Sequence, residues 1–138
     1  VELFKVFKDN NLNSTISHIE YRIDEFKLSK VNEDGYKTFR DFYNETKLPL
    51  DLFVLIAFSF NHQIRFNNKH KFNNPFGKDR SHFNDNMKKN LINFILKLKN
   101  GSFHLSNKDF NDFNFSQLSS SDFVYCDPPY LITTGAYN

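Results

Sequence analysis

Four residues near the end of the chain, Asp127-Pro128-Pro129-Tyr130, combine side chains that suit chemistry on a planar amine. Each proline fixes φ at about −65° and lacks a backbone N–H, so the corner is rigid and its carbonyls are free acceptors. The Asp127 carboxylate and the Pro128 carbonyl can each accept one N–H of an amino group, while Tyr130 stacks on the ring that carries it. Such contacts draw the amine lone pair out of ring conjugation, which suits methylation. The alternative interpretation is that these four residues have no chemical role and form a proline-rich turn with a surface tyrosine.

The elements expected to position this corner lie just before it. The apolar run at 122–126 predicts a buried strand, and residues 102–105 predict a second strand. Ligands of open α/β sheets bind beyond the carboxyl ends of strands, where Asp127 would lie. We therefore expect residues 101–138 to be α/β in character and part of a catalytic domain that ends in this corner.

The first hundred residues show helical spacing of apolar side chains, with Ser14 or Thr15 as a cap for the second helix. A break at about 62–77, rich in Asn and aromatic residues, predicts a β-hairpin or a loop with a basic tip. Residues 1–100 are therefore expected to form a mostly helical region. The predicted helices span 2–9, 14–28, 35–46, 50–60 and 84–99.

The charge is concentrated in the middle of the chain. Residues 62–100 carry nine basic and two acidic side chains, although the whole chain has a net charge of only +2. A locally basic segment in a nearly neutral protein is typical of a surface that contacts phosphates. A solvated helix face is an equally good interpretation of four of these cations: Lys88, Lys89, Lys97 and Lys99.

Several classes of protein do not fit the sequence. The longest apolar run, 52–58, is too short for a bilayer span, so no membrane partner is expected. The single cysteine, Cys126, cannot form an internal disulfide, and the five histidines lack the spacing of a metal site. A reducing, cytoplasmic location follows as an expectation. Because the chain starts with Val1 rather than Met, we expect it to be part of a longer protein.

Two segments resemble a known family. Asp-Pro-Pro-Tyr after Val-Tyr-Cys resembles motif IV of DNA adenine-N6 methyltransferases, and Ser59 to Lys78, with its Phe72-Asn-Asn-Pro-Phe-Gly sequence, resembles the target-recognition region of the Dam-like group. The resemblance extends loosely from Glu20 to Asn138. It implies a Rossmann-like, S-adenosylmethionine-dependent methyltransferase domain that carries a helical recognition insertion with a β-hairpin. It also implies a bacterial or phage-encoded enzyme, with duplex DNA as a partner and a cognate restriction endonuclease as a candidate partner.

The resemblance also suggests roles for individual residues. Arg65 matches an arginine that reads a guanine, a role that suits a guanidinium able to bond O6 and N7 together. Phe60 matches an aromatic that inserts into DNA near the flipped adenine. Gln63 and Asp79 depart from the Dam pattern, so the target need not be GATC. The full set expected to contact DNA is Phe60, Asn61, Gln63, Arg65, Pro75 and Lys78. Structural interpretations remain: an ion pair for Arg65 and a core ring for Phe60.

Relatives place a polar-aromatic pair against the adenine of the cofactor, and Asp109-Phe110 has the corresponding spacing before Asp127. An N-cap followed by a core phenylalanine explains the same pair equally well. The family also has a Phe-x-Gly-x-Gly loop, whereas the glycines here lie only at positions 35, 77, 101 and 135. We therefore expect this chain alone to be inactive as a site-specific methyltransferase and to bind S-adenosylmethionine weakly or not at all.

Two other functions remain open. The chain could be a DNA-binding module or a remnant without catalysis, with Asp127 to Tyr130 merely ending a strand. It could also serve methylation of another planar amine, such as an RNA base or a protein glutamine, although the resemblance around Arg65 disfavours that. A restriction-modification enzyme that methylates adenine N6 in DNA is the function that the residues and the resemblance favour together.

Overall fold

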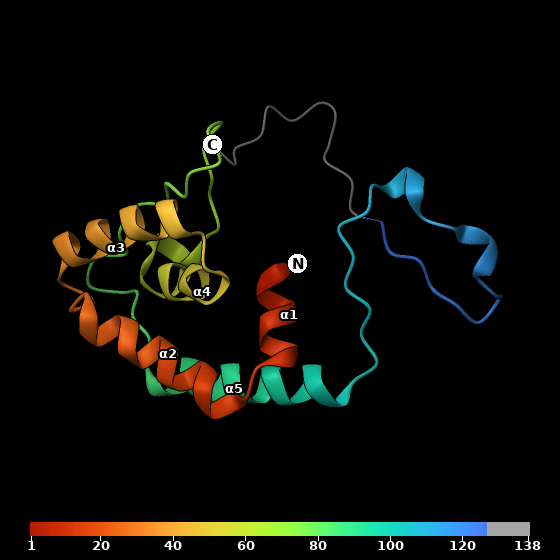
Figure 1. The fold of residues 1–138 in the computed structure, drawn as a ribbon, viewed down its shortest axis with the longest axis horizontal. Coiled ribbons are helices and arrows are strands. Elements are labelled where there is room, and N and C mark those ends of the chain that lie inside the picture. The colour runs from red at the N-terminus through yellow and green to blue at the C-terminus, as the bar shows by residue number, and fades with distance from the viewer. Residues whose placement is uncertain (127–138) are drawn as a thin grey trace. The chain divides into compact units, whose positions relative to one another are not determined.

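A computed structural model describes residues 1–126. The chain divides into two units, Val1–Leu105 and Ser106–Asn138, and the second is described as far as Cys126. The first unit contains five α-helices, which are labelled in Figure 1. The helical prediction for this part of the chain is confirmed. The helices are α1 (Glu2–Asp9), α2 (Leu12–Glu25), α3 (Glu33–Thr46), α4 (Pro49–Phe58) and α5 (Asp85–Asn100).

Asparagine side chains start three of these helices. Asn11 accepts hydrogen bonds from two N–H groups of α2, and Asn32 and Asn84 do the same for one N–H each in α3 and α5. A side-chain oxygen at this position satisfies N–H groups that the first helical turn leaves unpaired. The cap of α2 is therefore Asn11, and the prediction of Ser14 or Thr15 was wrong.

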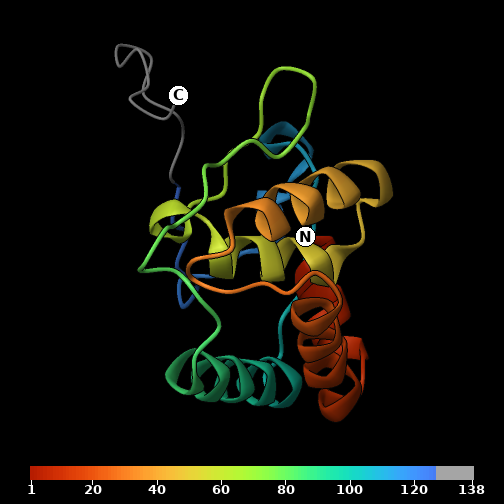
Figure 2. The ribbon, with the colours of Figure 1, turned by 90° about the vertical axis from the view of Figure 1, so that its left-hand side faces the viewer.

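Helix α4 lies at the centre of the first unit. Its sequence, PLDLFVLIAF, is apolar on nearly every side, which is typical of a helix surrounded by others. It contacts α1, α2 and α3, as the two ribbon views show (Figures 1 and 2). Val54 and Leu55 are fully buried, and Phe58 at its end is 2% exposed. The last turn of α4 is thus a fixed base for the segment that follows.

A buried polar contact joins α2 to α4. Asp51 is fully buried in the first turn of α4, and its Oδ1 lies 2.7 Å from Nε2 of His18 and 3.1 Å from Nε of Arg22. A buried carboxylate needs such partners because it has lost its hydration. The contact fixes how the two helices meet and makes α4 a rigid part of the unit.

The predicted strands do not form. Residues 122–126 are all exposed and 102–105 are mostly exposed, and the part of the chain up to Cys126 contains no sheet of the Rossmann-like kind. A strand needs a hydrogen-bonded neighbour, and the described residues offer none to either run. The predicted hairpin at 62–77 is also absent as a pair of strands: only the isolated bridges Ser59–Phe76 and Phe66–Phe72 occur there. In the second unit the described residues form short 3₁₀ turns at Phe110–Asp112 and Phe115–Gln117.

Candidate nucleic-acid interface

Residues 59–78, which follow α4, form a loop whose two ends meet on the helical unit. The Phe60 N–H donates to the Pro75 carbonyl at 2.8 Å, and the Gly77 N–H donates to the Phe58 carbonyl at 2.9 Å. Figure 2 shows this loop in yellow-green, extending beyond α3 and α4. The 59–78 loop therefore leaves and rejoins the unit at one place while its middle projects outward.

One buried side chain shapes the first part of the 59–78 loop. Asn74 is 2% exposed, and its amide nitrogen donates to the carbonyls of Phe60 (2.9 Å) and Gln63 (3.0 Å). Between these carbonyls, Asn61 and His62 have positive φ values of 51° and 53°. This left-handed conformation is uncommon for residues other than glycine and persists only where neighbouring contacts hold it.

Helix α3 holds Asn74 in turn. The Tyr36 hydroxyl donates to the Asn74 backbone carbonyl at 2.8 Å, and the Tyr36 ring packs against Phe76 with centroids 5.4 Å apart. Tyr36 is 1% exposed, and this burial raises the pKa of its hydroxyl, which therefore remains a neutral donor. The loop is thus tied directly to the buried face of α3.

A second anchor lies further along α3. The Asn44 side chain accepts from the Phe72 N–H at 2.7 Å and donates to the Phe72 carbonyl at 3.0 Å, as a neighbouring strand would. The Phe72 ring is 1% exposed and meets Tyr43 and Phe66 edge to face. Lys47 donates to the His70 carbonyl at 2.8 Å. Side chains of α3 therefore replace the missing strand pairing.

The tip of the loop is a turn built on Asn67. Its side-chain oxygen accepts from the N–H groups of Lys69 (2.9 Å) and Lys71 (3.1 Å). Asparagine favours such turns because its short carboxamide bonds to nearby backbone N–H groups. The turn places the exposed Lys69 at the outer end of the loop.

The 59–78 loop carries all the residues predicted to contact DNA. Phe60 is 45% exposed, so it is not a core ring. Arg65 is half-buried, and its guanidinium makes no hydrogen bond or ion pair with any residue in 1–126. The structural interpretation of Arg65 as an ion-pair partner thus finds no support in the described chain. The remaining predicted contacts are all exposed: Asn61, Gln63, Pro75 and Lys78.

Sequence reasoning missed the residues that hold the loop. Asn74 was placed in the segment that resembles a target-recognition region, but neither it nor Tyr36 and Asn44 was assigned a role of its own. The available signal was the cluster of asparagines beside Pro75, since a buried asparagine must find partners for its amide. Nothing in the local pattern indicates that the amide would bond to the Phe60 and Gln63 carbonyls, or that Tyr36 of α3 would bond to the Asn74 backbone carbonyl.

The family comparison bears on what this loop does. A model of the D12 class of N6 adenine-specific DNA methyltransferases matches residues 1–138. The chain belongs to this family. Its loop is therefore part of an adenine-N6 methyltransferase sequence, and the resemblance noted from the residues is confirmed.

Three curated relatives show how much of a longer methyltransferase the chain corresponds to. The chain is 53% identical to type II methyltransferase M.FokI of Planomicrobium okeanokoites over 138 residues, which cover 100% of this chain and 21% of that protein. It is 52% identical to modification methylase StsI of Streptococcus sanguinis, covering 99% and 21%. It is 28% identical to modification methylase LlaI of Lactococcus lactis subsp. lactis, covering 99% and 22%. The chain thus spans about a fifth of the length of these relatives.

Members of the D12 class use S-adenosylmethionine, and the pair predicted to hold its adenine fits that group chemically. Oδ1 of Asp109 accepts from the N–H of Asn111 (2.9 Å) and from its side-chain amide (2.8 Å), while Oδ2 makes no hydrogen bond within residues 1–126. Phe110 is 63% exposed and packs only against Phe115 among the described rings. Asp109 is thus an N-cap that keeps one acceptor, and Phe110 offers a ring face rather than a core contact.

Asp127, Pro128, Pro129 and Tyr130 lie outside the described residues. Their assignment as the D12-class amine-binding corner therefore stays a prediction from sequence.

The lysines of α5 do not join the basic loop. Lys88 forms an ion pair with Glu20, and Lys99 donates to the backbone carbonyls of Lys8 and Asn10. Both ribbon views place α5 at the opposite end of the first unit from the 59–78 loop (Figures 1 and 2). The basic middle third of the sequence is therefore divided between two places, and Lys88 and Lys99 act within the fold.

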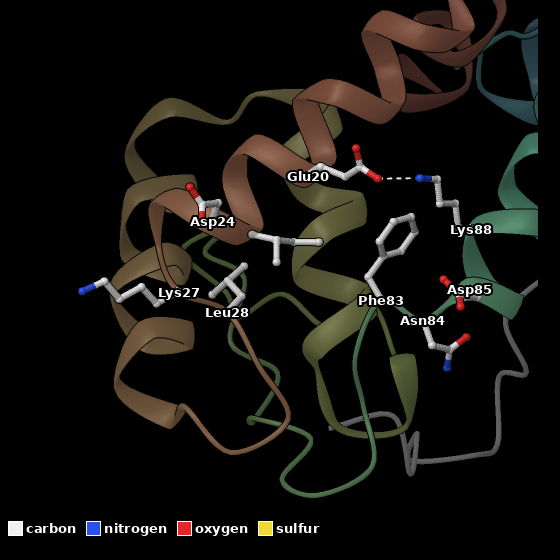
Figure 3. A pocket seen from close by; sticks show the side chains of 9 residues that line it. Glu20, Asp24, Lys27, Leu28, Phe83, Asn84, Asp85 and Lys88 are labelled. Carbon is white, nitrogen blue, oxygen red and sulfur yellow. Dashed lines mark hydrogen bonds and ion pairs between the residues drawn. The ribbon is translucent and has the colours of Figure 1, made fainter.

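A cavity of about 520 Å³ lies between α2 and the start of α5 (Figure 3). Its polar lining includes the carboxylates of Glu20, Asp24 and Asp85 and the lysines Lys27 and Lys88. Because acidic groups outnumber basic ones and Lys88 already pairs with Glu20, the cavity is a poor site for phosphate. It does not form part of the candidate interface.

The described chain holds neither a metal site nor a membrane-spanning helix. Within residues 1–126, no three side chains among His, Cys, Asp and Glu are grouped so that they could hold a metal ion. None of the described helices has both the length and the apolar character needed to cross a bilayer.

Proposed function

We propose that this chain is the target-recognition region and part of the catalytic domain of an adenine-N6 DNA methyltransferase of a restriction-modification system. Residues 1–100 would recognise duplex DNA, and residues 101–138 would contribute to a Rossmann-like catalytic domain. The proposal includes a cytoplasmic location and a cognate restriction endonuclease that acts on the same sequence. The relatives' printed names, type II methyltransferase and modification methylase, support this role.

The proposal is supported mainly by Arg65, whose guanidinium makes no hydrogen bond or ion pair within residues 1–126. A guanidinium without a partner in the described chain lies on a loop that α3 holds in one conformation. Arginine has a rigid fork of donors that matches O6 and N7 of guanine. A fixed loop lowers the entropy that such a contact costs on binding. The exposed Lys69 and Lys78 on the same loop can contact phosphates and set its register on the duplex.

The chemical role proposed for the C-terminal motif follows from its residue types. A target adenine must leave the stack before its N6 amine can be reached, at a cost of a few kcal/mol. Tyr130 would offset part of this cost by stacking on the extruded base. Asp127 and the Pro128 carbonyl would each accept one N–H of the amine, with Pro129 keeping the corner rigid. S-adenosylmethionine would supply the methyl group, and Asp109 and Phe110 would hold its adenine end.

Replacing Arg65 tests the recognition role directly. The 138-residue chain would be mixed with a pool of duplexes that have a randomised centre, and the retained sequences would be read. Arg65→Ala should lose preference at one base pair by roughly 1–3 kcal/mol, or about 5- to 150-fold. Binding should also weaken steeply as salt rises, because phosphate contacts release counterions.

Lys97→Ala is the matched control. Lys97 is exposed on α5, away from the 59–78 loop, and the substitution removes the same charge. It should leave sequence preference unchanged. If the wild-type chain retains no sequence above the rest, or if Arg65→Ala keeps the wild-type preference, the recognition role is wrong. Equal binding of duplex DNA and duplex RNA would favour another substrate class.

A further inference from the structure

We infer that Asn74 is a positioning residue that fixes residues 60–63 in the conformation that reads the target sequence. The inference rests on the proposed function and deepens it. Asn74 is 2% exposed, so it makes no contact with DNA itself. Three of the predicted DNA contacts lie in the segment that it holds: Phe60, Asn61 and Gln63.

The hydrogen bonds around the segment single out Asn74. Its amide reaches the Phe60 carbonyl at 2.9 Å and the Gln63 carbonyl at 3.0 Å. The other bonds to the same carbonyls are long: the Gln63 N–H lies 3.3 Å from the Phe60 oxygen, and the Ser59 hydroxyl lies 3.4 Å from the Gln63 oxygen. Hydrogen bonds weaken as they lengthen beyond about 3.2 Å. Asn74 thus supplies the two short bonds that hold the carbonyls of Phe60 and Gln63, at the two ends of the segment, on one side chain.

These bonds also oppose a conformational cost. Asn61 and His62 both have positive φ, which side chains other than glycine rarely adopt. Without the two bonds from Asn74, His62 keeps its N–H bond to the Ser59 carbonyl (3.2 Å) and its ring contact with the Ile56 carbonyl (3.1 Å), but no short bond holds the Phe60 and Gln63 carbonyls at the two ends of the segment. The side chains of Asn61 and Gln63 would then sample several directions. Loss of Asn74 is therefore expected to act on specificity more than on the attraction to phosphates.

Arg65 provides an internal reference. Its backbone carbonyl accepts from the Asn73 N–H at 3.0 Å, and Phe72, two residues before Asn74, is held by Asn44. These contacts do not involve the Asn74 side chain. A substitution at Asn74 should consequently change preference at the base pairs read by residues 60–63 and leave the base pair read by Arg65 unchanged.

The experiment compares wild type with Asn74→Ala, both as the 138-residue chain, in two measurements. Scalar couplings that report φ at Asn61 and His62, measured without DNA, should change from one fixed value to an average. Selection from the randomised duplex pool should show a drop of about tenfold in preference at the base pairs assigned to residues 60–63, because two acceptors lose their donor. Preference at the base pair that Arg65→Ala affects should persist.

Two further variants make the result decisive. Asn11→Ala removes an asparagine that caps α2 and makes no hydrogen bond to the 59–78 loop within the described chain, so it controls for a general loss of stability. Asn74→Ser keeps one donor and replaces Asn74→Ala if that variant does not fold. Unchanged couplings, or an unchanged pattern of preference in a folded Asn74 variant, would overturn the inference. Altered couplings in a chain whose wild type selects no sequence would uphold the positioning and reject the proposed function.

Discussion

Two irregular segments of this chain, the 59–78 loop and residues 106–126, are stabilised in different ways. Neither contains a regular strand, and both are rich in Asn and Phe. In the loop, the side-chain bonds of Asn44 and Tyr36 join residues that are 28 and 38 positions apart in the sequence. These bonds are buried or half-buried and reach a helical core.

In residues 106–126 the side-chain bonds are local. Asp109 bonds to Asn111 and Asn114 bonds to Ser116, two positions away in each case, and Asp122 bonds to Ser119 three positions away. All of these groups are exposed. Local bonds of this kind define turns but leave the path between turns to other contacts. An irregular segment is therefore fixed by distant anchors and not by the number of its hydrogen bonds, and the following substitutions test that difference.

The largest effect is expected from Phe72→Ala. Phe72 is 1% exposed between Tyr43 and Phe66, and losing a buried ring of this size costs about 3–5 kcal/mol of unfolding free energy. Phe113→Ala, in the other segment, removes a ring that is 52% exposed and should cost less than about 0.5 kcal/mol. Urea unfolding followed by circular dichroism measures both. Equal losses of unfolding free energy in the two variants would show that both segments are packed against a core to the same extent.

A smaller effect is expected from Gly77→Ala. A Cβ built at Gly77 would lie 2.1 Å from Oγ of the buried Ser81 and 2.7 Å from the backbone oxygen of Ser59. Because that oxygen belongs to the base of the loop, relief requires a backbone shift costing about 1–3 kcal/mol. Gly101→Ala is the control: its new Cβ would meet mainly the ring of Phe103, which is 48% exposed and can rotate away.

Thermal unfolding and amide hydrogen exchange in the 59–78 loop distinguish the two glycine variants. Gly77→Ala should lower the melting temperature and speed amide hydrogen exchange at Phe60, whose N–H bonds to Pro75 across the base of the loop. Gly101→Ala should cost less than about 0.5 kcal/mol of unfolding free energy, so the melting temperature and the exchange rate at Phe60 should stay close to those of wild type. An unchanged melting temperature for Gly77→Ala would mean that the base of the loop is not tightly packed.

Local patterns were sufficient for the helices. Apolar spacing predicted all five, because each helix closes its hydrogen bonds within its own residues. The prediction of strands at 102–105 and 122–126 was wrong. A strand forms its hydrogen bonds with a neighbouring strand, and its own sequence does not specify that partner. The cap at Asn11 was missed because serine and threonine nearby are good caps too.

The loop was predictable in part. Its position and its candidate DNA contacts came from the resemblance around Arg65, but its anchors did not, because the contact of Asn44 with Phe72 spans 28 residues. The charge pattern did not decide the role of the α5 lysines. It left Lys88 and Lys99 open between phosphate contacts and a solvated helix face, whereas the fold uses them to join α5 to α2 and to the end of α1.

The smallest expected effect is a local response to acid at Asp122. Its carboxylate accepts from the Ser119 N–H at 2.7 Å and from the Ser119 hydroxyl at 2.8 Å, and these bonds lower the pKa of Asp122. Since the folded pKa lies below the unfolded one, the turn gains stability above the ordinary carboxyl range. That gain is lost as the pH falls through the lowered pKa. The Ser119 amide resonance, followed by NMR, should shift with that titration.

The base of the 59–78 loop should not respond in this way, because Asn74 and Tyr36 join it to the core through neutral groups, whereas the ion pair of Lys71 with Glu45 lies near the tip. Over the pH range in which Asp122 titrates, the Phe60 amide should therefore remain unshifted while that of Ser119 moves. Asp122→Asn should abolish the Ser119 titration without changing the melting temperature, since the turn lies in an exposed segment. A parallel shift of both amides would mean that acid acts on the fold as a whole, and the distinction between distant anchors and local turns would fail.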